Sequence, residues 1–167
     1  MKFSPSYILK EDNNELFYYK TINTALCYGV IPIYIDQDGV FHTIFVKGKR
    51  KLSFPKGKKE NNEMPLQCAI RETREETSLE LGKHYTFIRT NKMYYDFLKN
   101  NSISTQYFPV KVFDKYTDLQ SEDGDEIHSV KWYSEHEIEQ LGEDLICNRR
   151  KYIFLEYIKE YKSLYAV

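Results

Sequence analysis

Runs of β-branched and aromatic residues alternate along this chain with polar turn signals and one strongly amphipathic stretch. Residues 24–35 and 41–46 form two such runs around Asp38-Gly39, a dipeptide typical of tight hairpin turns. This pattern predicts a β-hairpin. From about Pro65 to Ser78 the apolar spacing changes to the helical period, which predicts a helix with one packed face and one wet face. The packed face is expected to hold Leu66, Ala69, Ile70 and Thr73.

The second half of the chain predicts further strands and two helices. Long strands are expected over 85–98 and 103–114, joined by Lys99-Asn100-Asn101, and a shorter strand over 127–133. Helical spacing marks 135–141 and 149–161. The apolar stripe of the last helix is expected to comprise Tyr152, Phe154, Leu155 and Ile158. Mixed strands between helices predict an α/β fold, arranged as an α/β/α sandwich with a mixed sheet.

Length and composition favour one domain with one core. The 167 residues are 41% hydrophobic and 16% aromatic, so we expect a single domain over 1–167 with residues 1–23 as an N-terminal extension. No apolar run reaches membrane-spanning length, and the N-terminus lacks the apolar core of a signal peptide. We therefore expect a cytoplasmic or nuclear protein with no membrane partner. Three isolated cysteines are expected to be buried free thiols: Cys27, Cys68 and Cys147.

Four acidic residues gather around the predicted helix over 65–78. Glu72, Glu75 and Glu76 share a helical face, and Glu63 stands near the helix start. Like charges this close repel by a few tenths of a kcal/mol per pair, roughly, and a divalent cation would reverse that sign. The alternative is a solvated, salt-bridged face, in which Arg71 and Arg74 neutralise the carboxylates.

The order of residue types around these carboxylates resembles the Nudix box, G-x5-E-x7-R-E-U-x-E-E-x-G-U, where U is a bulky aliphatic residue. In residues 57–79, seven of the nine defined positions match: Gly57, Glu63, Arg71, Glu72, Glu75, Glu76 and Leu79. The two departures are Thr73 at an aliphatic position and Ser78 at the second glycine. Ser78 lacks glycine's easy access to positive φ, so it affects the helix end more than the chemistry.

The resemblance implies metal-dependent hydrolysis of a pyrophosphate bond. In this family the metal ligands, for Mg²⁺ or Mn²⁺, correspond to Gly57 through its carbonyl oxygen, Glu72, Glu75 and Glu76. The resemblance then assigns Glu75, Glu76 and Arg71 to the catalytic group. Within it, Arg71 would orient the loop and the metal ligands together with Glu63. Family members take the general base from the box or from a downstream acidic residue. The downstream candidates are Glu122, Asp123, Asp125 and Glu126, and we favour Glu126.

Substrate contacts must come from outside the box. Residues 47–59 contain seven basic residues in thirteen positions, a surface that would attract a polyphosphate chain or an RNA backbone. The alternative is a solubilising loop. Aromatic residues of the predicted strands could stack a base, although strand alternation sends about half of such side chains into the core. The candidate substrate-binding residues are Lys47, Arg50, Lys56, Lys58, Tyr94 and Tyr107.

Two subfamilies share features with the chain. LSFPKGKK followed by CAIRE resembles the Nudix domain of eukaryotic mRNA decapping enzymes, which implies a cap-type substrate. That subfamily usually carries a helical domain ahead of the Nudix domain, and residues 1–23 are too short to supply it. The compact layout resembles diadenosine tetraphosphate hydrolases. Diphosphoinositol polyphosphate hydrolysis and a non-catalytic nucleotide- or RNA-binding module are further alternatives. The expected partner is a small nucleotide or polyphosphate substrate, or a capped RNA. No DNA partner is expected.

Overall fold

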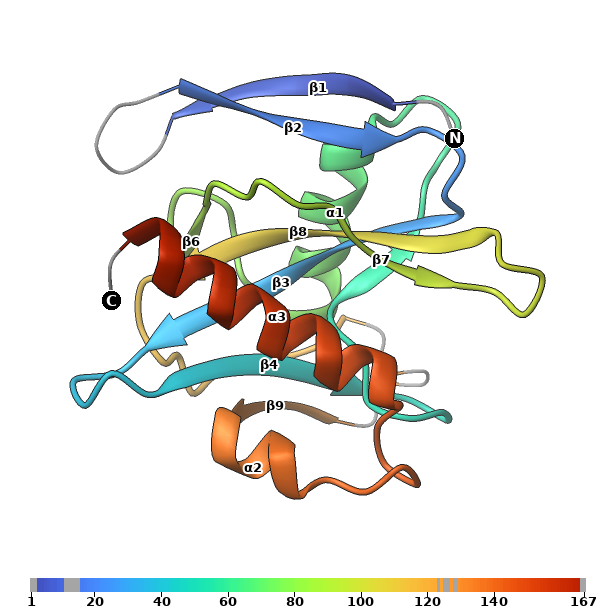
Figure 1. The fold of residues 1–167 in the computed structure, drawn as a ribbon. Helices are drawn as coiled ribbons and strands as arrows, with labels where there is room; N and C mark the ends of the chain where they lie inside the picture. The colour runs from blue at the N-terminus through green and yellow to red at the C-terminus, as the bar shows by residue number, and fades with distance from the viewer. Residues whose placement is uncertain (1–2, 11–15, 123, 125–126, 128, 166–167) are drawn as a thin grey trace.

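The computed structural model describes residues 3–10, 16–122, 124, 127 and 129–165. The strands are β1 (Phe3–Lys10), β2 (Leu16–Ile22), β3 (Cys27–Ile35), β4 (Phe41–Lys47), β5 (Lys56–Lys58), β6 (Tyr85–Phe87), β7 (Tyr94–Phe97), β8 (Ile103–Val112) and β9 (Ser129–Ser134). The helices are α1 (Pro65–Thr77), α2 (Glu135–Gln140) and α3 (Asn148–Tyr165). Strands β3 to β9 form one mixed sheet, and helices lie on both of its faces (Figure 1).

The main sheet has the strand order β6-β8-β3-β4-β9, with β5 paired to β3 and β7 paired to β8. The pair β3–β8 is parallel, with Tyr28 beside Gln106 and Val30 beside Phe108. The other pairings are antiparallel. This confirms the predicted mixed sheet.

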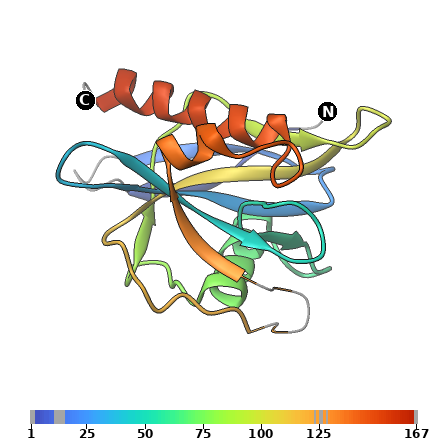
Figure 2. The same ribbon diagram turned by 90° about the horizontal axis from the view of Figure 1, so that it is seen from below.

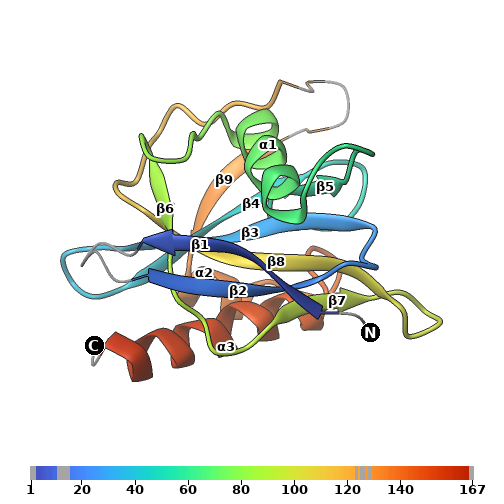
Figure 3. The same ribbon diagram turned by 90° about the horizontal axis from the view of Figure 1, so that it is seen from above.

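Helices α1 and α3 cover opposite faces of this sheet (Figures 2 and 3). Alternate side chains of β3 point to opposite faces, as the period of a strand requires. Val30 packs in the core cluster that contains Leu66 of α1, while Ile31 packs in the cluster that contains Phe154 of α3. The structure is therefore the predicted α/β/α sandwich.

Local signals placed the first hairpin and the shorter elements correctly. Gly39 has φ +79°, a conformation that L side chains rarely adopt, and its N–H donates to the Asp36 carbonyl oxygen at 3.0 Å. The helix expected over 135–141 is α2, and a capping box between Ser134 and Glu137 fixes its start. The Glu137 N–H donates to Ser134 Oγ and the Ser134 N–H donates to Glu137 Oε1, each at 3.1 Å.

The single strand expected over 85–98 is wrong, because β6 and β7 are separate strands on one edge of β8. Between them, Thr90 Oγ1 and the Asn91 N–H each donate to the carboxylate of Glu160 on α3 at 2.6 Å. Glu160 is buried. These bonds direct the backbone toward α3 and away from β8, which interrupts the strand.

The apolar stripe expected on α3 is partly wrong. Phe154 and Ile158 are buried, but Tyr152 is 53% exposed and Leu155 is 37% exposed. The buried stripe runs instead along Ile153, Phe154, Tyr157, Ile158 and Tyr161. Its spacing of three and four residues is that of a packed helical face, and Tyr152 lies outside it.

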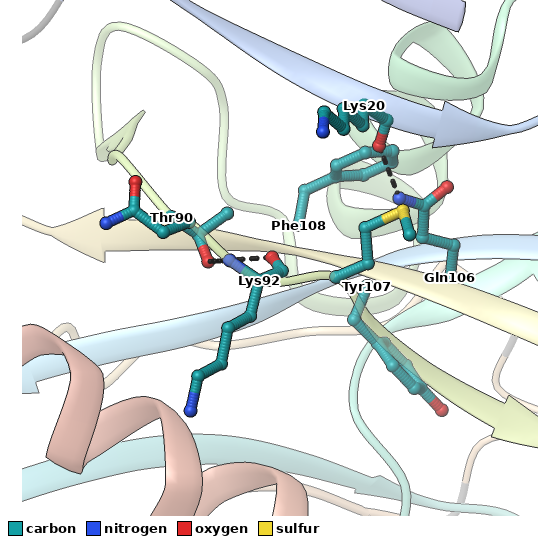
Figure 4. Close-up of a pocket in the computed structure, with 8 residues that line it drawn as sticks. Lys20, Thr90, Lys92, Gln106, Tyr107 and Phe108 are labelled. Atoms are coloured by element: carbon teal, nitrogen blue, oxygen red, sulfur yellow. Dashed lines mark hydrogen bonds between the residues drawn. The ribbon is translucent and has the colours of Figure 1, made fainter. Parts of the chain in front are cut away.

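The expected N-terminal extension contains β1 and β2, which form an antiparallel two-stranded sheet. The Gln106 side chain ties this sheet to β8: its Nε2 donates to the Lys20 carbonyl oxygen and its Oε1 accepts from the Ile22 N–H, both at 2.8 Å. Figure 4 shows the cavity of about 260 Å³ beside this junction. The single-domain boundary over 1–167 remains a prediction.

The three cysteines are free, but the expectation that all are buried is wrong. Cys68 is buried, whereas Cys27 and Cys147 are partly exposed. Among the described residues, no helix combines the length and the apolar character needed to cross a membrane.

Candidate active site

Helix α1 carries the glutamates, and both of its ends are fixed. The Met64 N–H donates to Gln67 Oε1 at 2.9 Å, and Pro65 begins the helix. At the other end Ser78 adopts φ +70°, the left-handed conformation that glycine usually supplies. Its Oγ donates to the Gln120 carbonyl oxygen at 2.6 Å. The departure at Ser78 is therefore accommodated, and the serine also fastens the loop after β8 to the helix.

The departure at Thr73 is accommodated as well. Thr73 is buried, and its Oγ1 donates to the Ala69 carbonyl oxygen at 2.7 Å. Because the hydroxyl group is bonded within the helix, it carries no unpaired polar atom into the core. The side chain can therefore fill an aliphatic position.

The predicted ligands meet at one cavity of about 740 Å³. Glu72, Glu75 and Glu76 of α1 line it from one side, and Gly57 of β5 lines it with them. The remaining lining residues are Cys27, Lys56, Lys58, Glu122 and Ile127. The sheet and the helix thus bring Gly57 to the glutamates, although the two segments are joined by a loop.

Gly57 is held between α1 and β3. A Cβ atom on Gly57 would lie 2.0 Å from the Glu72 carboxylate carbon, so a larger residue would displace this carboxylate. On β3, Gly57 is paired with Tyr28. The Cys68 thiol donates to the Gly57 carbonyl oxygen at 3.4 Å. Burial raises the pKa of Cys68 to about 12, so this thiol stays protonated and remains a donor.

Arg71 links the glutamates to one another. Its Nε donates to Glu63 Oε2 at 2.5 Å and its Nη2 to Glu63 Oε1 at 3.0 Å, a bidentate pair. Nη1 donates to Glu72 Oε1 at 2.9 Å and to Glu75 Oε2 at 3.1 Å. Nη2 also donates to the Lys58 carbonyl oxygen at 3.0 Å. One guanidinium therefore positions two of the predicted ligands and the strand that carries Gly57.

The carboxylates differ in their electrostatics. Burial raises the pKa of Glu76 to about 7, although the Lys56 N–H donates to its Oε1 at 2.9 Å and opposes the shift. Burial also raises the pKa of Glu72, against the effect of Arg71. The hydrogen bond from Arg71 lowers the pKa of Glu63. The positive groups next to Glu76 and Glu72 are therefore too weak to offset the effect of burial on the pKa of these two carboxyl groups.

The donor set suits a hard divalent cation such as Mg²⁺ or Mn²⁺, which prefers carboxylate and carbonyl oxygens. As placed, the described residues contain no group of three carboxylate, thiol or imidazole side chains close enough to share one ion. Arg71 Nη1 is bonded to both Glu72 and Glu75. Loading the site would therefore exchange these two hydrogen bonds for bonds to the cation, while the bidentate pair with Glu63 could stay.

The candidate basic residues divide into two groups. Lys56 and Lys58 line the glutamate cavity. Lys47 and Arg50 do not: Lys47 ends β4, where it pairs with Ser129 of β9, and Arg50 is exposed in the following loop. Only the first group is placed to contact the same part of a ligand as the glutamates.

Tyr94 and Tyr107 do not occupy the expected position. They are 5% and 1% exposed and belong to the core cluster under α3, on the sheet face opposite α1. The Tyr94 hydroxyl donates to Glu160 and the Tyr107 hydroxyl donates to Asp96. Since both rings are packed on the far face, neither presents a surface on which a base could stack in this structure.

The favoured general base, Glu126, lies outside the described residues, and its role remains a prediction. Of the other acidic candidates, Glu122 lines the glutamate cavity. Its N–H donates to the Glu75 carbonyl oxygen at 2.7 Å, and its Oε1 accepts from Arg74 at 3.1 Å. Sequence reasoning did not single out Cys27 or Cys68 for this site, because an isolated cysteine gives no spacing signal.

Comparison with known proteins places this geometry in context. Residues 29–154 match the profile of the NUDIX domain. Over 113 residues the chain is 31% identical to the m7GpppN-mRNA hydrolase dcap-2 of Caenorhabditis elegans. That match covers 66% of this chain and 14% of that protein, so the chain corresponds to a small part of this relative.

Solved structures of similar fold include a C. elegans Ap4A hydrolase in a binary complex, with a TM-score of 0.65 and 17% identity. That alignment covers 82% of this chain and 98% of the other. A NUDIX-family hydrolase from Clostridium perfringens has a TM-score of 0.60 at 16% identity, with 86% and 99% of the two chains covered. At these identities the similarity concerns the fold.

Proposed function

Because the chain belongs to the NUDIX family, we propose that it is a metal-dependent pyrophosphohydrolase that cleaves a phosphoanhydride bond in a nucleoside diphosphate-linked substrate. One observation carries this proposal: Gly57 and the glutamates of α1 line a single cavity that also contains Lys56 and Lys58. Carboxylates and lysines that line one cavity suit a polyphosphate held through divalent cations.

Gly57, Glu72, Glu75 and Glu76 would hold the metal. When bound there, a divalent cation neutralises phosphate charge and lowers the pKa of an attacking water. The chain's own residues prepare this chemistry. Arg71 fixes the orientation of Glu72 and Glu75, and the N–H of Lys56 orients Glu76. Lys56 and Lys58 would bind phosphate oxygens, and Glu126 would accept the proton of the water.

A non-catalytic binding module with this fold would not need a complete ligand set. Here the glutamates at all three ligand positions line the cavity. A complete set of carboxylate ligands is what metal-dependent hydrolysis requires, so it supports catalysis over binding alone.

Among substrates, we favour a capped RNA. The similarity to dcap-2, an mRNA hydrolase, is the sequence match with the higher identity among the relatives described above. The basic loop, which we define as residues 47–51 with Lys47, Lys49, Arg50 and Lys51, lies outside the glutamate cavity and could contact a longer chain. A dinucleoside polyphosphate is the second candidate, since Lys56 and Lys58 alone could serve a small polyphosphate. A diphosphoinositol would use the same two lysines.

A substrate panel tests the proposal. Purified protein is incubated with Mg²⁺ or Mn²⁺ and with capped RNA, a dinucleoside polyphosphate, a nucleotide sugar or a diphosphoinositol. We expect metal-dependent release of a nucleoside diphosphate and 5′-monophosphorylated RNA from the capped substrate. The Glu76→Gln variant is the control for contaminating hydrolases. Absence of hydrolysis with every substrate and metal would refute an enzymatic function, while preferred cleavage of the dinucleoside polyphosphate would favour the second candidate.

A further inference from the structure

A cluster of aromatic rings surrounds one arginine where β7 meets the start of α3. The Arg149 guanidinium carbon lies 5.7 Å from the ring centre of Tyr95, 5.4 Å from that of Phe97 and 5.7 Å from that of Tyr152. These distances are within the range of cation–π contacts. Arg149 Nη2 also donates to the Tyr95 carbonyl oxygen at 2.9 Å, which fixes the guanidinium to the strand. We call these four residues the Arg149 cluster.

Two rings of the Arg149 cluster face solvent. Phe97 is 49% exposed and Tyr152 is 53% exposed, although most other aromatic side chains whose burial the structure describes are buried. The Phe97 ring also makes an edge-to-face contact with Tyr95, with the ring centres 5.1 Å apart at an interplanar angle of 90°. A fixed arginine with half-exposed rings around it gives a surface on which further planar groups can stack.

The Arg149 cluster adjoins the basic loop. Arg150, the next residue, donates through Nη1 to the carbonyl oxygen of Leu52, which follows the basic loop, at 3.1 Å. The Leu52 N–H donates to the Leu145 carbonyl oxygen at 2.7 Å, so the segment before α3 is bonded to the same place. Two segments distant in sequence thus bring basic side chains and exposed rings to one region.

The same region lies level with the glutamate cavity along the strands of the sheet. Arg150 Nε lies 3.6 Å from Oδ2 of Asp96, the β7 residue between Tyr95 and Phe97. Asp96 is paired with Thr105 on β8, Thr105 with Cys27 on β3, and Cys27 with Lys58 on β5. Cys27 and Lys58 line the glutamate cavity. This row places the Arg149 cluster level with the cavity residues along the strands, at the same end of the sheet.

We propose that the Arg149 cluster and the basic loop together bind a single-stranded RNA segment whose 5′ end enters the glutamate cavity. Bases would stack on the exposed faces of Phe97 and Tyr152, and the basic loop would contact the phosphates. Neither contact requires a particular base, so the surface would bind RNA with little sequence preference. This inference rests on the proposed cap-type function for the identity of the 5′ end.

Binding of a capped 20-nucleotide RNA, measured by fluorescence anisotropy without divalent metal, tests the inference. The Phe97→Ala/Tyr152→Ala variant should bind this RNA about tenfold more weakly than the parent, and should lose less affinity for a cap dinucleotide. The matched control is Phe113→Ala/Tyr165→Ala. These aromatic residues are 46% and 37% exposed, and they follow β8 and end α3, away from the Arg149 cluster. The control should bind RNA within twofold of the parent.

Equal RNA affinity in the parent and in Phe97→Ala/Tyr152→Ala would overturn the inference, and so would equal losses in the two double variants. Crosslinking of a 4-thiouridine RNA to the parent protein gives a test that needs no variant. Crosslinked peptides should contain Phe97 or Tyr152, and crosslinks confined to other segments would also overturn it. Hydrolysis of the cap dinucleotide is measured separately, so failure of the proposed function is seen independently of RNA binding.

Discussion

Gly57 and Glu72 are packed so closely that a Cβ atom on Gly57 would lie 2.0 Å from the Glu72 carboxylate carbon and 2.2 Å from its Oε1. The strand β5 and the helix α1 therefore meet through a residue without a side chain. This contact brings the Gly57 backbone against the Glu72 carboxylate, and both residues line the glutamate cavity.

Replacing Gly57 should separate these two ligands. In Gly57→Ala, the Glu72 carboxylate or β5 must move, so we expect turnover to fall by about a hundredfold or more and Mn²⁺ binding to weaken. Steady-state kinetics and Mn²⁺ titration measure the two effects. Gly124→Ala is the control, because a Cβ there would have no atom within 4 Å. Wild-type Mn²⁺ affinity in Gly57→Ala would contradict the assigned ligand set.

The bidentate pair of Arg71 and Glu63 predicts non-additive kinetics. Glu63→Gln and Arg71→Gln should each lower turnover about tenfold, because the bidentate pair holds the guanidinium beside the ligands and bonded to the Lys58 carbonyl oxygen, and each substitution breaks that pair. The double variant should then be no slower than Arg71→Gln alone. Multiplied losses in the double variant would show that the two residues act separately.

Much of the fold was predictable from short-range patterns. The hairpin at Gly39, the helix α1 and its glutamate face depend on turn residues and periodicity within a few positions. The break between β6 and β7 depends instead on Glu160, which lies about seventy positions from its partners Thr90 and Asn91. No local pattern encodes such a contact, so the pattern of residues 85–98 predicts one strand.

The site was predictable to the same extent. The box residues were identified because their spacing is fixed by one helix and the loop before it. The substrate-binding role predicted for Tyr94 and Tyr107 does not agree with their burial under α3. The alternation of side chains along a strand defines two faces, but it does not show which face packs under that helix. Two of the exposed rings, Phe97 and Tyr152, come together around Arg149 through the packing of β7 against α3. That packing is a tertiary contact, which sequence spacing does not show.

The raised pKa of Glu76 predicts a pH-dependent gain in stability when its charge is removed. Its folded-state pKa of about 7 is above the ordinary value of 4.5, so the folded state binds the proton more tightly. The metal-free protein should lose stability as pH rises from about 4.5 through 7. Glu76→Gln keeps the acceptor for the Lys56 N–H. At pH 8 its free energy of unfolding should exceed that of the parent by up to about 3 kcal/mol, at about 1.4 kcal/mol per pKa unit.

Urea unfolding with a chelator, at pH 5 and at pH 8, measures this difference. At pH 5 the parent carboxyl is mostly protonated, so the two proteins should have nearly equal midpoints. An equal gain at both pH values would show that removal of charge is not the cause.

The basic loop distinguishes an RNA substrate from a small polyphosphate. Alanine at Lys47, Lys49, Arg50 and Lys51 should weaken capped RNA far more than cap dinucleotide, and should flatten the salt dependence of RNA binding. Alanine at Lys56 and Lys58, which line the glutamate cavity, should weaken both ligands. Salt titrations of binding provide the comparison. Equal losses for both ligands in the loop variant, with no advantage of RNA in the parent, would favour the dinucleoside polyphosphate.

The most direct test of the central claim is the metal-dependent turnover of Glu75→Gln beside the parent, on whichever substrate of the panel the parent cleaves fastest. Glu75 is partly exposed and is bonded to Arg71, so glutamine should preserve the fold while removing a ligand charge. We predict that turnover falls by at least about a hundredfold with an unchanged unfolding temperature. Turnover within a few-fold of the parent at saturating metal would contradict the assignment of the α1 glutamates as the metal site.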